Sequence, residues 1–162
     1  MASFSEVETA YLYFPERVQS LMLSTTTADG APHASYAPFI MERDRTFYIF
    51  VSGLSSHTQN LKATGKAGIL LIEDEAQASQ IFARQRLMYD CTVTLIARND
   101  PQWTTWGDKF AVRFGNLITM LRQLPDFQMF QLKPQAGRFV VGFGAAYAVD
   151  SSNLDRLMPT EK

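Results

Sequence analysis

Runs in which hydrophobic and polar residues alternate make up most of the chain. Alternation with a period of two is typical of strands that bury one face. It occurs on both sides of Asp29-Gly30, a pair that tolerates the positive φ of a tight hairpin turn, and so predicts two strands within residues 20–41. Similar runs predict further strands in four segments: 43–51, 66–74, 87–98 and 127–149. We expect the last segment to divide into two strands at the turn Pro134-Gln-Ala-Gly.

Three segments carry hydrophobic residues at helical spacing instead. The first covers residues 5–19, with Ser5 as the expected cap and Pro15 as the residue that bends or ends the helix. A short helix is expected at 57–65, and the region 101–124 repeats aromatic residues every three or four positions. We expect those aromatics in a helix core or in a dimer contact.

These elements predict a mainly β fold, an antiparallel β-barrel with α-helices inserted between some of the strands. About six or seven strands with hairpin-like connections favour it over a parallel βαβ sheet. The chain has no G-x-G-x-x-G after a strand and no G-x-x-x-x-G-K-[ST], which excludes dinucleotide-binding and P-loop sites. The length of 162 residues predicts one domain over 1–150 and a C-terminal tail over 151–162.

Composition narrows the possible partners. Lys plus Arg number 15 and Asp plus Glu number 16, so the overall charge gives no basis for binding nucleic acid or a membrane surface. No apolar window approaches the ~20 residues that span a bilayer, and the N-terminus does not resemble a signal peptide. Cys91 is the only cysteine, which excludes an intramolecular disulfide and a cysteine-rich zinc site. We expect a cytoplasmic protein without a metal site.

The segment Ser52–Leu61, SGLSSHTQNL, is a candidate anion site. A helix that begins there presents free backbone N–H groups and the positive end of its dipole where a strand ends. The hydroxyls of Ser52, Ser56 and Thr58 could add hydrogen bonds to a phosphate, and His57 could donate one more. Ordinary helix capping is the alternative, and it is the commoner role of serines before a helix.

A second candidate is the pair Arg84 and Arg86 in FARQRL. Their alternation on the approach to a strand would place both on one side of it. A pair of arginines at a strand end is commonly solvated, which is the alternative here. If both candidate segments lined one cleft, they would suit a phosphate-bearing cofactor with an electron-accepting ring.

Three motifs in this order, SSHTQNL, FARQRL and GRFVVGFGAAY, resemble those of the pyridoxamine 5′-phosphate oxidase-like FMN-binding split barrels, particularly the haem-utilisation branch of HugZ type. The resemblance extends from about Glu8 to Val149. It implies a six-stranded antiparallel split barrel that forms a homodimer, with FMN bound in each of two clefts at the subunit interface. It further implies cofactor contacts from twelve residues: Ser35, Tyr36, Ala37, Pro38, Val51, Ser52, Ser56, His57, Thr58, Arg84, Arg86 and Phe143.

The resemblance leaves three functions open. The first is a flavin-dependent oxidoreductase, in which Arg86 would tune the ring and Tyr36 could face the substrate, with no catalytic acid or base identified. The second is a haem-binding or haem-degrading protein, although residues 144–162 contain no histidine and only His33 and His57 could ligate iron. The third is a flavin-binding module without turnover. At the phosphate turn, His57 and Thr58 stand where the oxidase itself has two cations.

Overall fold

The computed structural model describes residues 2–159. The chain begins with helix α1 (Phe4–Tyr13), which continues as the 3₁₀ helix η1 (Phe14–Arg17). Ser3, and not the predicted Ser5, caps α1, because the Ser3 hydroxyl accepts from the Glu6 N–H while the Glu6 carboxylate accepts from the Ser3 N–H. Pro15 lies in the first turn of η1, where a missing N–H costs nothing, and the α-helix ends just before it, as the sequence predicted.

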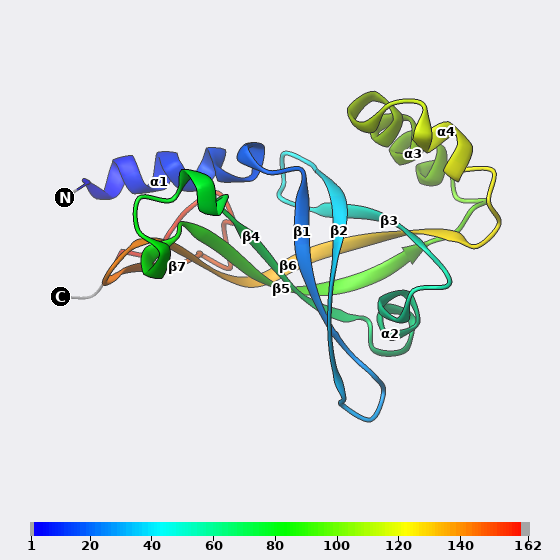
Figure 1. Cartoon of the computed structure of the whole chain (residues 1–162), viewed down its shortest axis with the longest axis horizontal. Coiled ribbons are helices and arrows are strands. Elements are labelled where there is room, and N and C mark those ends of the chain that lie inside the picture. The colour runs from blue at the N-terminus through cyan, green and yellow to red at the C-terminus, as the bar shows by residue number, and fades with distance from the viewer. Residues whose placement is uncertain (1, 160–162) are drawn as a thin grey trace.

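Six antiparallel strands close into a barrel (Figure 1). They are β1 (Ser20–Thr26), β2 (Pro32–Met41), β3 (Phe47–Ser52), β4 (Lys66–Ile72), β5 (Arg86–Ile96) and β6 (Phe127–Gly142). The strand order is β3-β2-β1-β4-β5-β6, and β3 also pairs with β6 to complete the closure. A short strand β7 (Ala145–Ala148) extends the sheet beyond β6. The predicted mainly β split barrel is therefore confirmed.

The last strand region differs from its prediction. We expected a turn at Pro134–Gly137, but β6 runs straight through these residues, and the chain reverses instead at Gly142–Ala145. The register against β5 shifts between Asp90 and Cys91, opposite Pro134. A bulge of this kind accommodates a proline that cannot donate to the ladder, so the sequence signal for a turn was a signal for a bulge.

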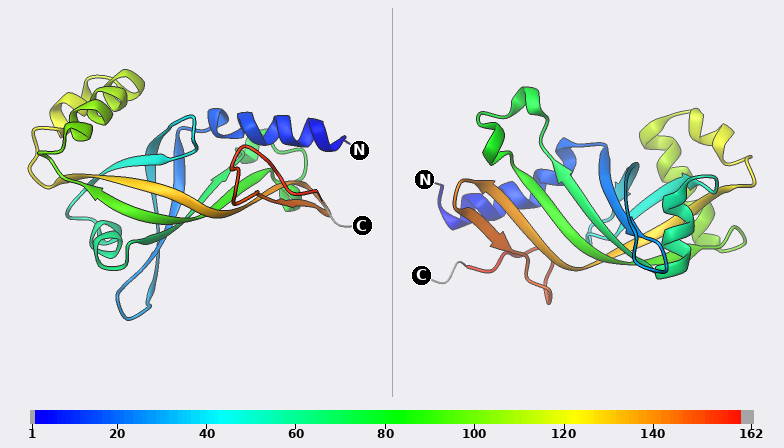
Figure 2. Two further views of the ribbon diagram at one scale, coloured as in Figure 1. Left: turned by 180° about the vertical axis from the view of Figure 1, so that it is seen from behind. Right: turned by 60° about the horizontal axis from the view of Figure 1, so that its bottom comes forward.

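Residues 2–159 include four α-helices. Besides α1, they are α2 (Ser56–Thr64), α3 (Pro101–Phe114) and α4 (Leu117–Leu121), with short 3₁₀ helices η2 (Glu75–Gln77) and η3 (Ile81–Ala83) in the β4–β5 connection. Figure 2 shows that connection projecting from the barrel. None of the helices in residues 2–159 has the length and apolar character required to cross a membrane.

Two apolar cores hold the barrel and the helices together. One fills the barrel and includes Tyr11, Phe14 and Phe139. The other joins the outside of β2, β3 and β6 to α3 and α4, where Trp106 stacks on Tyr48 at a centroid distance of 3.8 Å. The aromatic repeat of residues 101–124 thus forms helix-to-sheet packing.

The segment after β7 folds back onto the barrel. Val149 pairs with Leu157, and the Asp155 carboxylate lies 3.2 Å from Nε of the buried Arg45. The Leu154 carbonyl accepts a hydrogen bond from the Tyr11 hydroxyl. These contacts join residues 149–157 to α1 and to the β2–β3 turn.

Candidate functional site

The predicted phosphate turn, residues 52–58, joins β3 to α2, and we call it the α2 entry turn. Ser55 is the helix cap by position, although its side chain makes no capping hydrogen bond. The Thr58 hydroxyl donates to the Ser52 carbonyl at 2.6 Å. The Ser52 hydroxyl donates to the Asp126 carboxylate at 2.8 Å and accepts from the Leu54 N–H at 3.1 Å. Two of the three predicted phosphate donors therefore already have partners within the protein.

Asp126 also changes the electrostatics of the α2 entry turn. Its backbone carbonyl accepts from the Gly53 N–H at 2.8 Å, which fixes this residue against the turn. The Asp126 carboxylate, one hydrogen bond away from Ser52, would repel a phosphate at the turn. Ser56 remains exposed and could still contact a ligand. The turn is less suited to an anion than its sequence predicted.

His57 links α2 to the barrel. Its Nδ1 lies 2.9 Å from the Ser35 hydroxyl, and only 8% of the residue is exposed. Burial is the main cause that lowers the pKa of His57, and the nearby His33 lowers it further. Nε2 is buried with no hydrogen-bond partner among residues 2–159. The structure thus brings Ser35 and His57 together, around a neutral imidazole.

The predicted cofactor residues of β2 and β3 point to two different sides. Tyr36 and Pro38 are exposed on the outside of the barrel, whereas Ala37 is buried within it. Val51 also belongs to the barrel core. Alternation along a strand requires this division, so of the four residues Ser35–Pro38 only Tyr36 and Pro38 can face a ligand on the outside.

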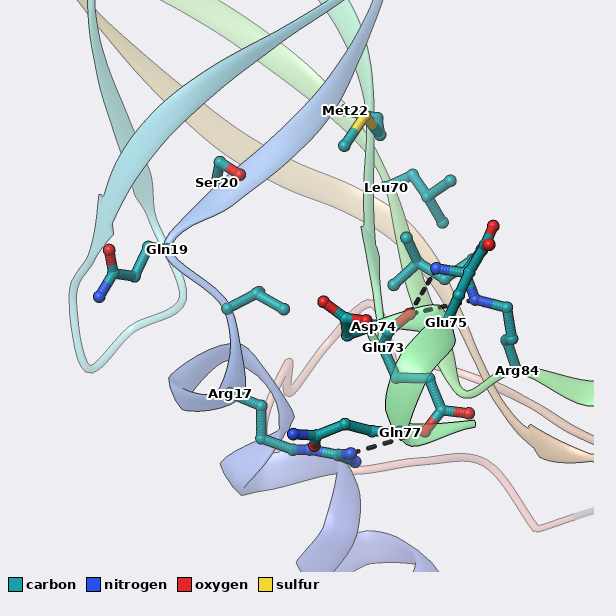
Figure 3. A pocket seen from close by; sticks show the side chains of 12 residues that line it. Arg17, Gln19, Ser20, Met22, Leu70, Glu73, Asp74, Glu75, Gln77 and Arg84 are labelled. Atoms are coloured by element: carbon teal, nitrogen blue, oxygen red, sulfur yellow. Dashed lines mark hydrogen bonds and ion pairs between the residues drawn. The ribbon is translucent and has the colours of Figure 1, made fainter. Parts of the chain in front are cut away.

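Arg84 lies beside a large groove of about 850 Å³ near the start of β1 and the end of β4 (Figure 3). Its Nε donates to the Glu73 carbonyl at 3.1 Å, and its Nη1 pairs with the Glu75 carboxylate at 3.2 Å. Across the groove, Arg17 pairs with the buried Glu73 at 3.5 Å. Both arginines in the groove are therefore already paired with acidic residues, which makes it a poor site for an anion.

Arg86 lies in a different groove, of about 360 Å³, and meets Phe143 there. Because Phe82 and Phe143 border it, we call it the two-Phe groove. Its other lining residues include Arg138, Met88 and the small residues of the β6–β7 turn. The Arg86 guanidinium donates to the Arg84 carbonyl at 3.0 Å, and no carboxylate pairs with it in the described chain. Here the structure unites two predicted cofactor residues, Arg86 and Phe143.

Sequence reasoning missed Phe82 and Arg138 in this groove. Phe82 is 83% exposed and stands beside the exposed Ile81 in a mostly polar connection, a conspicuous place for large apolar side chains. Arg138 alternates with Phe139 and pairs directly opposite Met88, which fixes its outward direction. The alternation on β6 could have revealed Arg138 once the strand was known to continue through Gly137.

The two candidate regions lie far apart in one chain. Figures 1 and 2 place α2 and β7 on opposite sides of the middle of the molecule along its long axis. The α2 entry turn lies on one side, and the two-Phe groove, which includes residues of β7, lies on the other. A cleft that holds residues from both regions would need a second copy of the chain.

Comparison with known proteins identifies the family. The family model described as pyridoxamine 5′-phosphate oxidase matches residues 7–141. The heme oxygenase HutZ of Vibrio cholerae is 38% identical over 141 residues, which are 87% of this chain and 80% of that protein.

Two crystal structures are also similar. HutZ of V. cholerae, described there as a heme storage protein, has a TM-score of 0.79 at 33% identity, covering 85% of this chain and 97% of that one. ChuZ of Campylobacter jejuni has a TM-score of 0.83 at 32% identity, covering 94% of this chain and 63% of ChuZ. The chain therefore belongs to the pyridoxamine 5′-phosphate oxidase family and is similar, within it, to proteins of the haem-utilisation branch.

Proposed function

We propose that this protein binds haem in a cleft between two copies of the chain. The observation that carries the proposal is the 38% identity to a haem oxygenase over 87% of the chain. At that identity, relatives share the arrangement of the barrel, whereas the chemistry depends on individual residues. Surfaces of this chain that suit a porphyrin give the proposal its further support.

The outside of the sheet offers such a surface. Tyr36 pairs opposite Met22, Met22 opposite Leu70, and Leu70 opposite Met88. These four residues form a row across β2, β1, β4 and β5, which we call the outer row, and Tyr36 and Met22 are 62% and 45% exposed. An apolar row of this kind suits one face of a large flat ring, and thioethers adapt well to such ligands.

The outer row also supports a homodimer. No helix of the described chain packs on it, so the row and the nearby Phe82 and Phe143 remain open to solvent. Exposed apolar side chains gathered in one region are typical of an interface. A second copy would cover it and could bring one chain's α2 entry turn near the other chain's two-Phe groove.

The histidines give this proposal no iron ligand in the described chain. Nδ1 of His57 contacts Ser35, and its Nε2 is enclosed. His33 shares its side of β2 with Ser35 and not with Tyr36, because it lies two residues from Ser35 along the strand. We therefore derive binding from contacts to the porphyrin, and we assign no axial ligand.

Haem supplies iron-centred oxygen chemistry when it is bound, and the chain would contribute position and exclusion of water. The outer row would support one face of the ring, and burial between two copies would keep bulk water away from it. Opening of the porphyrin ring is a proposed activity that follows from binding and can be tested separately.

Flavin-dependent oxidation is the second candidate, and the match to the oxidase family favours it. It would use FMN with Arg86 beside the ring and the α2 entry turn at the phosphate. The Asp126 carboxylate and the internally bonded hydroxyls of Ser52 and Thr58 oppose that placement. Flavin binding without turnover would meet the same obstacle.

The test is parallel titration of the purified protein with haem and with FMN, followed by visible absorbance and by FMN fluorescence. We expect a Soret band that saturates with haem, FMN binding that is weaker, and a dimer by analytical ultracentrifugation. Replacing His33 and His57 in turn by Ala should leave the band in place. Tight FMN binding with no spectral response to haem would instead establish the flavin candidate.

Haem breakdown is tested on the loaded protein. Addition of a reductant under oxygen should bleach the Soret band and release iron, which a ferrous chelator can report. A stable band under these conditions, with haem bound, would restrict the function to binding.

A further inference from the structure

We propose that the two-Phe groove holds the carboxylate edge of a tetrapyrrole, with Arg86 and Arg138 each pairing one carboxylate. The inference rests on the proposed haem binding and deepens it by locating one edge of the ligand. It starts from three properties of the groove: two unpaired cations, two exposed aromatic rings, and a volume smaller than a whole porphyrin needs.

The two guanidinium groups come from neighbouring strands on the same side of the sheet. Arg86 pairs opposite Val140 and Met88 pairs opposite Arg138, so the two arginines are diagonal neighbours. Such neighbours have Cα atoms about 7–8 Å apart, within reach of long side chains. Both residues line the groove.

Neither cation is neutralised in the described part of the chain. Five other arginines pair with carboxylates: Arg17, Arg45, Arg84, Arg122 and Arg156. Arg86 donates only to a backbone carbonyl, and no ion pair within 4.0 Å involves Arg138 over residues 2–159. Two like charges placed side by side repel each other, so an anion between them would stabilise both.

Asp90 is the nearest competing acid by position, as the other diagonal neighbour of Arg138 on β5. It is exposed, and the β5–β6 register shifts immediately after it. No ion pair forms between Asp90 and Arg138 within 4.0 Å in residues 2–159. With no carboxylate paired to it in the described residues, the Arg138 guanidinium is available to a ligand.

The aromatic rings of Phe82 and Phe143 border these charges. They are 83% and 73% exposed, and they come from two connections, 61 residues apart in the sequence. Between them the β6–β7 turn presents only Gly142, Gly144 and alanines besides Phe143, so little side-chain volume fills the groove. Exposed rings beside unpaired arginines suit a planar aromatic ligand that carries negative charge.

Two separate cations favour a dicarboxylate over a phosphate monoester. The tetrapyrrole of haem carries two carboxylates on one edge, so each guanidinium could take one of them in a bidentate contact. FMN has a single phosphate remote from its ring. A volume of about 360 Å³ admits one edge of a porphyrin, and Met88 connects the groove to the outer row, where the rest of the ring would extend.

The test uses protoporphyrin IX without iron and its dimethyl ester, titrated by porphyrin fluorescence. Removing iron eliminates axial ligation, and esterification removes only the two negative charges. The wild-type protein should bind the free acid about ten- to a hundredfold more tightly than the ester, from the scale of hydrogen bonds between charged groups. Arg138→Gln should lose most of this preference by weakening acid binding, and Arg138→Lys should retain part of it.

Arg43→Gln is the matched control, because it removes one exposed positive charge at the β2–β3 turn, outside the groove. It should keep the wild-type preference, and circular dichroism should show all variants folded. If wild type binds acid and ester equally, or if Arg138→Gln keeps the full preference while haem still binds, the groove is not the carboxylate site and haem binding itself stands. If neither haem nor either porphyrin binds, the proposed function fails and this inference fails with it.

Discussion

The α2 entry turn and the two-Phe groove contrast in how their polar groups are used. The turn contains several hydroxyls, a histidine and a helix start, yet Ser52 and Thr58 bond within the protein and His57 bonds to Ser35. The groove has only two arginines, and neither pairs with a carboxylate in residues 2–159. The turn has many polar groups, and several of them form hydrogen bonds within the protein. The groove has few polar groups, but its two arginines are available to a ligand.

This contrast separates structural polarity from polarity available to a ligand. Buried donors and acceptors are nearly always satisfied, so a cluster of them indicates a junction that must be held together. Exposed charges without partners, next to exposed aromatic rings, have no such structural use. The groove is therefore the better candidate for ligand contacts, and mutations should affect the two regions differently.

The largest effect is expected from Gly137→Ala, beside the groove. A Cβ at this position would lie 2.6 Å from Cε1 of Tyr89 and 2.9 Å from the Met88 carbonyl oxygen. The Tyr89 ring is buried and packs on Phe47, so it has little room to move. We expect a loss of about 1–3 kcal/mol in the free energy of unfolding, measured by urea denaturation.

The same substitution should also reduce the preference for porphyrin acid over ester, because a shift of β6 displaces Arg138. Gly53→Ala is the counterpart in the α2 entry turn, where a Cβ would lie 2.7 Å from the Asp126 carbonyl oxygen. It should reduce stability and leave the porphyrin preference unchanged. Equal effects of both variants on that preference would contradict the separation of the two regions.

A smaller effect is expected from Thr58→Val in the α2 entry turn. The change keeps the shape of a fully buried side chain and removes the hydrogen bond to the Ser52 carbonyl. The unfolding free energy should fall by about 0.5–1.5 kcal/mol, and the affinities for haem and FMN should stay at wild-type values. Ser56→Ala, at an exposed neighbour, is the control and should change stability little.

A marked loss of FMN affinity in Thr58→Val, without loss of stability, would show that this hydroxyl serves a phosphate and not the turn. That result would restore the α2 entry turn as the cofactor site.

The sequence predicted the barrel because strand alternation depends on neighbouring residues. It failed at Pro134, where a turn and a bulge share the same local signal and only the long pairing of β5 with β6 decides between them. It also assigned the cap of α1 to Ser5, although the reciprocal bonds of Ser3 and Glu6 set the start of that helix.

The site was harder to predict because its residues differ in their partners and not in their type. Arg84 and Arg86 are alike in sequence, but Arg84 is paired with Glu75 and Arg86 is not. The partner of Ser52 is Asp126, which is 74 residues away. Arg138 becomes a neighbour of Arg86 only through strand register, which no local pattern specifies.

The smallest expected effect is a change in pH dependence through His57. Burial lowers the pKa of this imidazole in the folded state, whereas in the unfolded chain its pKa should lie near the ordinary histidine value of 6.5. Between these two pKa values the unfolded state binds more protons than the folded state, so stability decreases as pH falls below 6.5 and is fully present above it. His57→Asn keeps a polar atom near Ser35 without a titrating group. As the pH falls, the unfolding free energy of this variant should therefore decrease less than that of wild type. Urea denaturation at several pH values between 8 and 5 measures the difference, with His33→Asn as the control for losing the nearby charge. Identical pH profiles for wild type and His57→Asn would mean that His57 is solvated in the folded protein, and the α2 entry turn would then be open to a ligand after all.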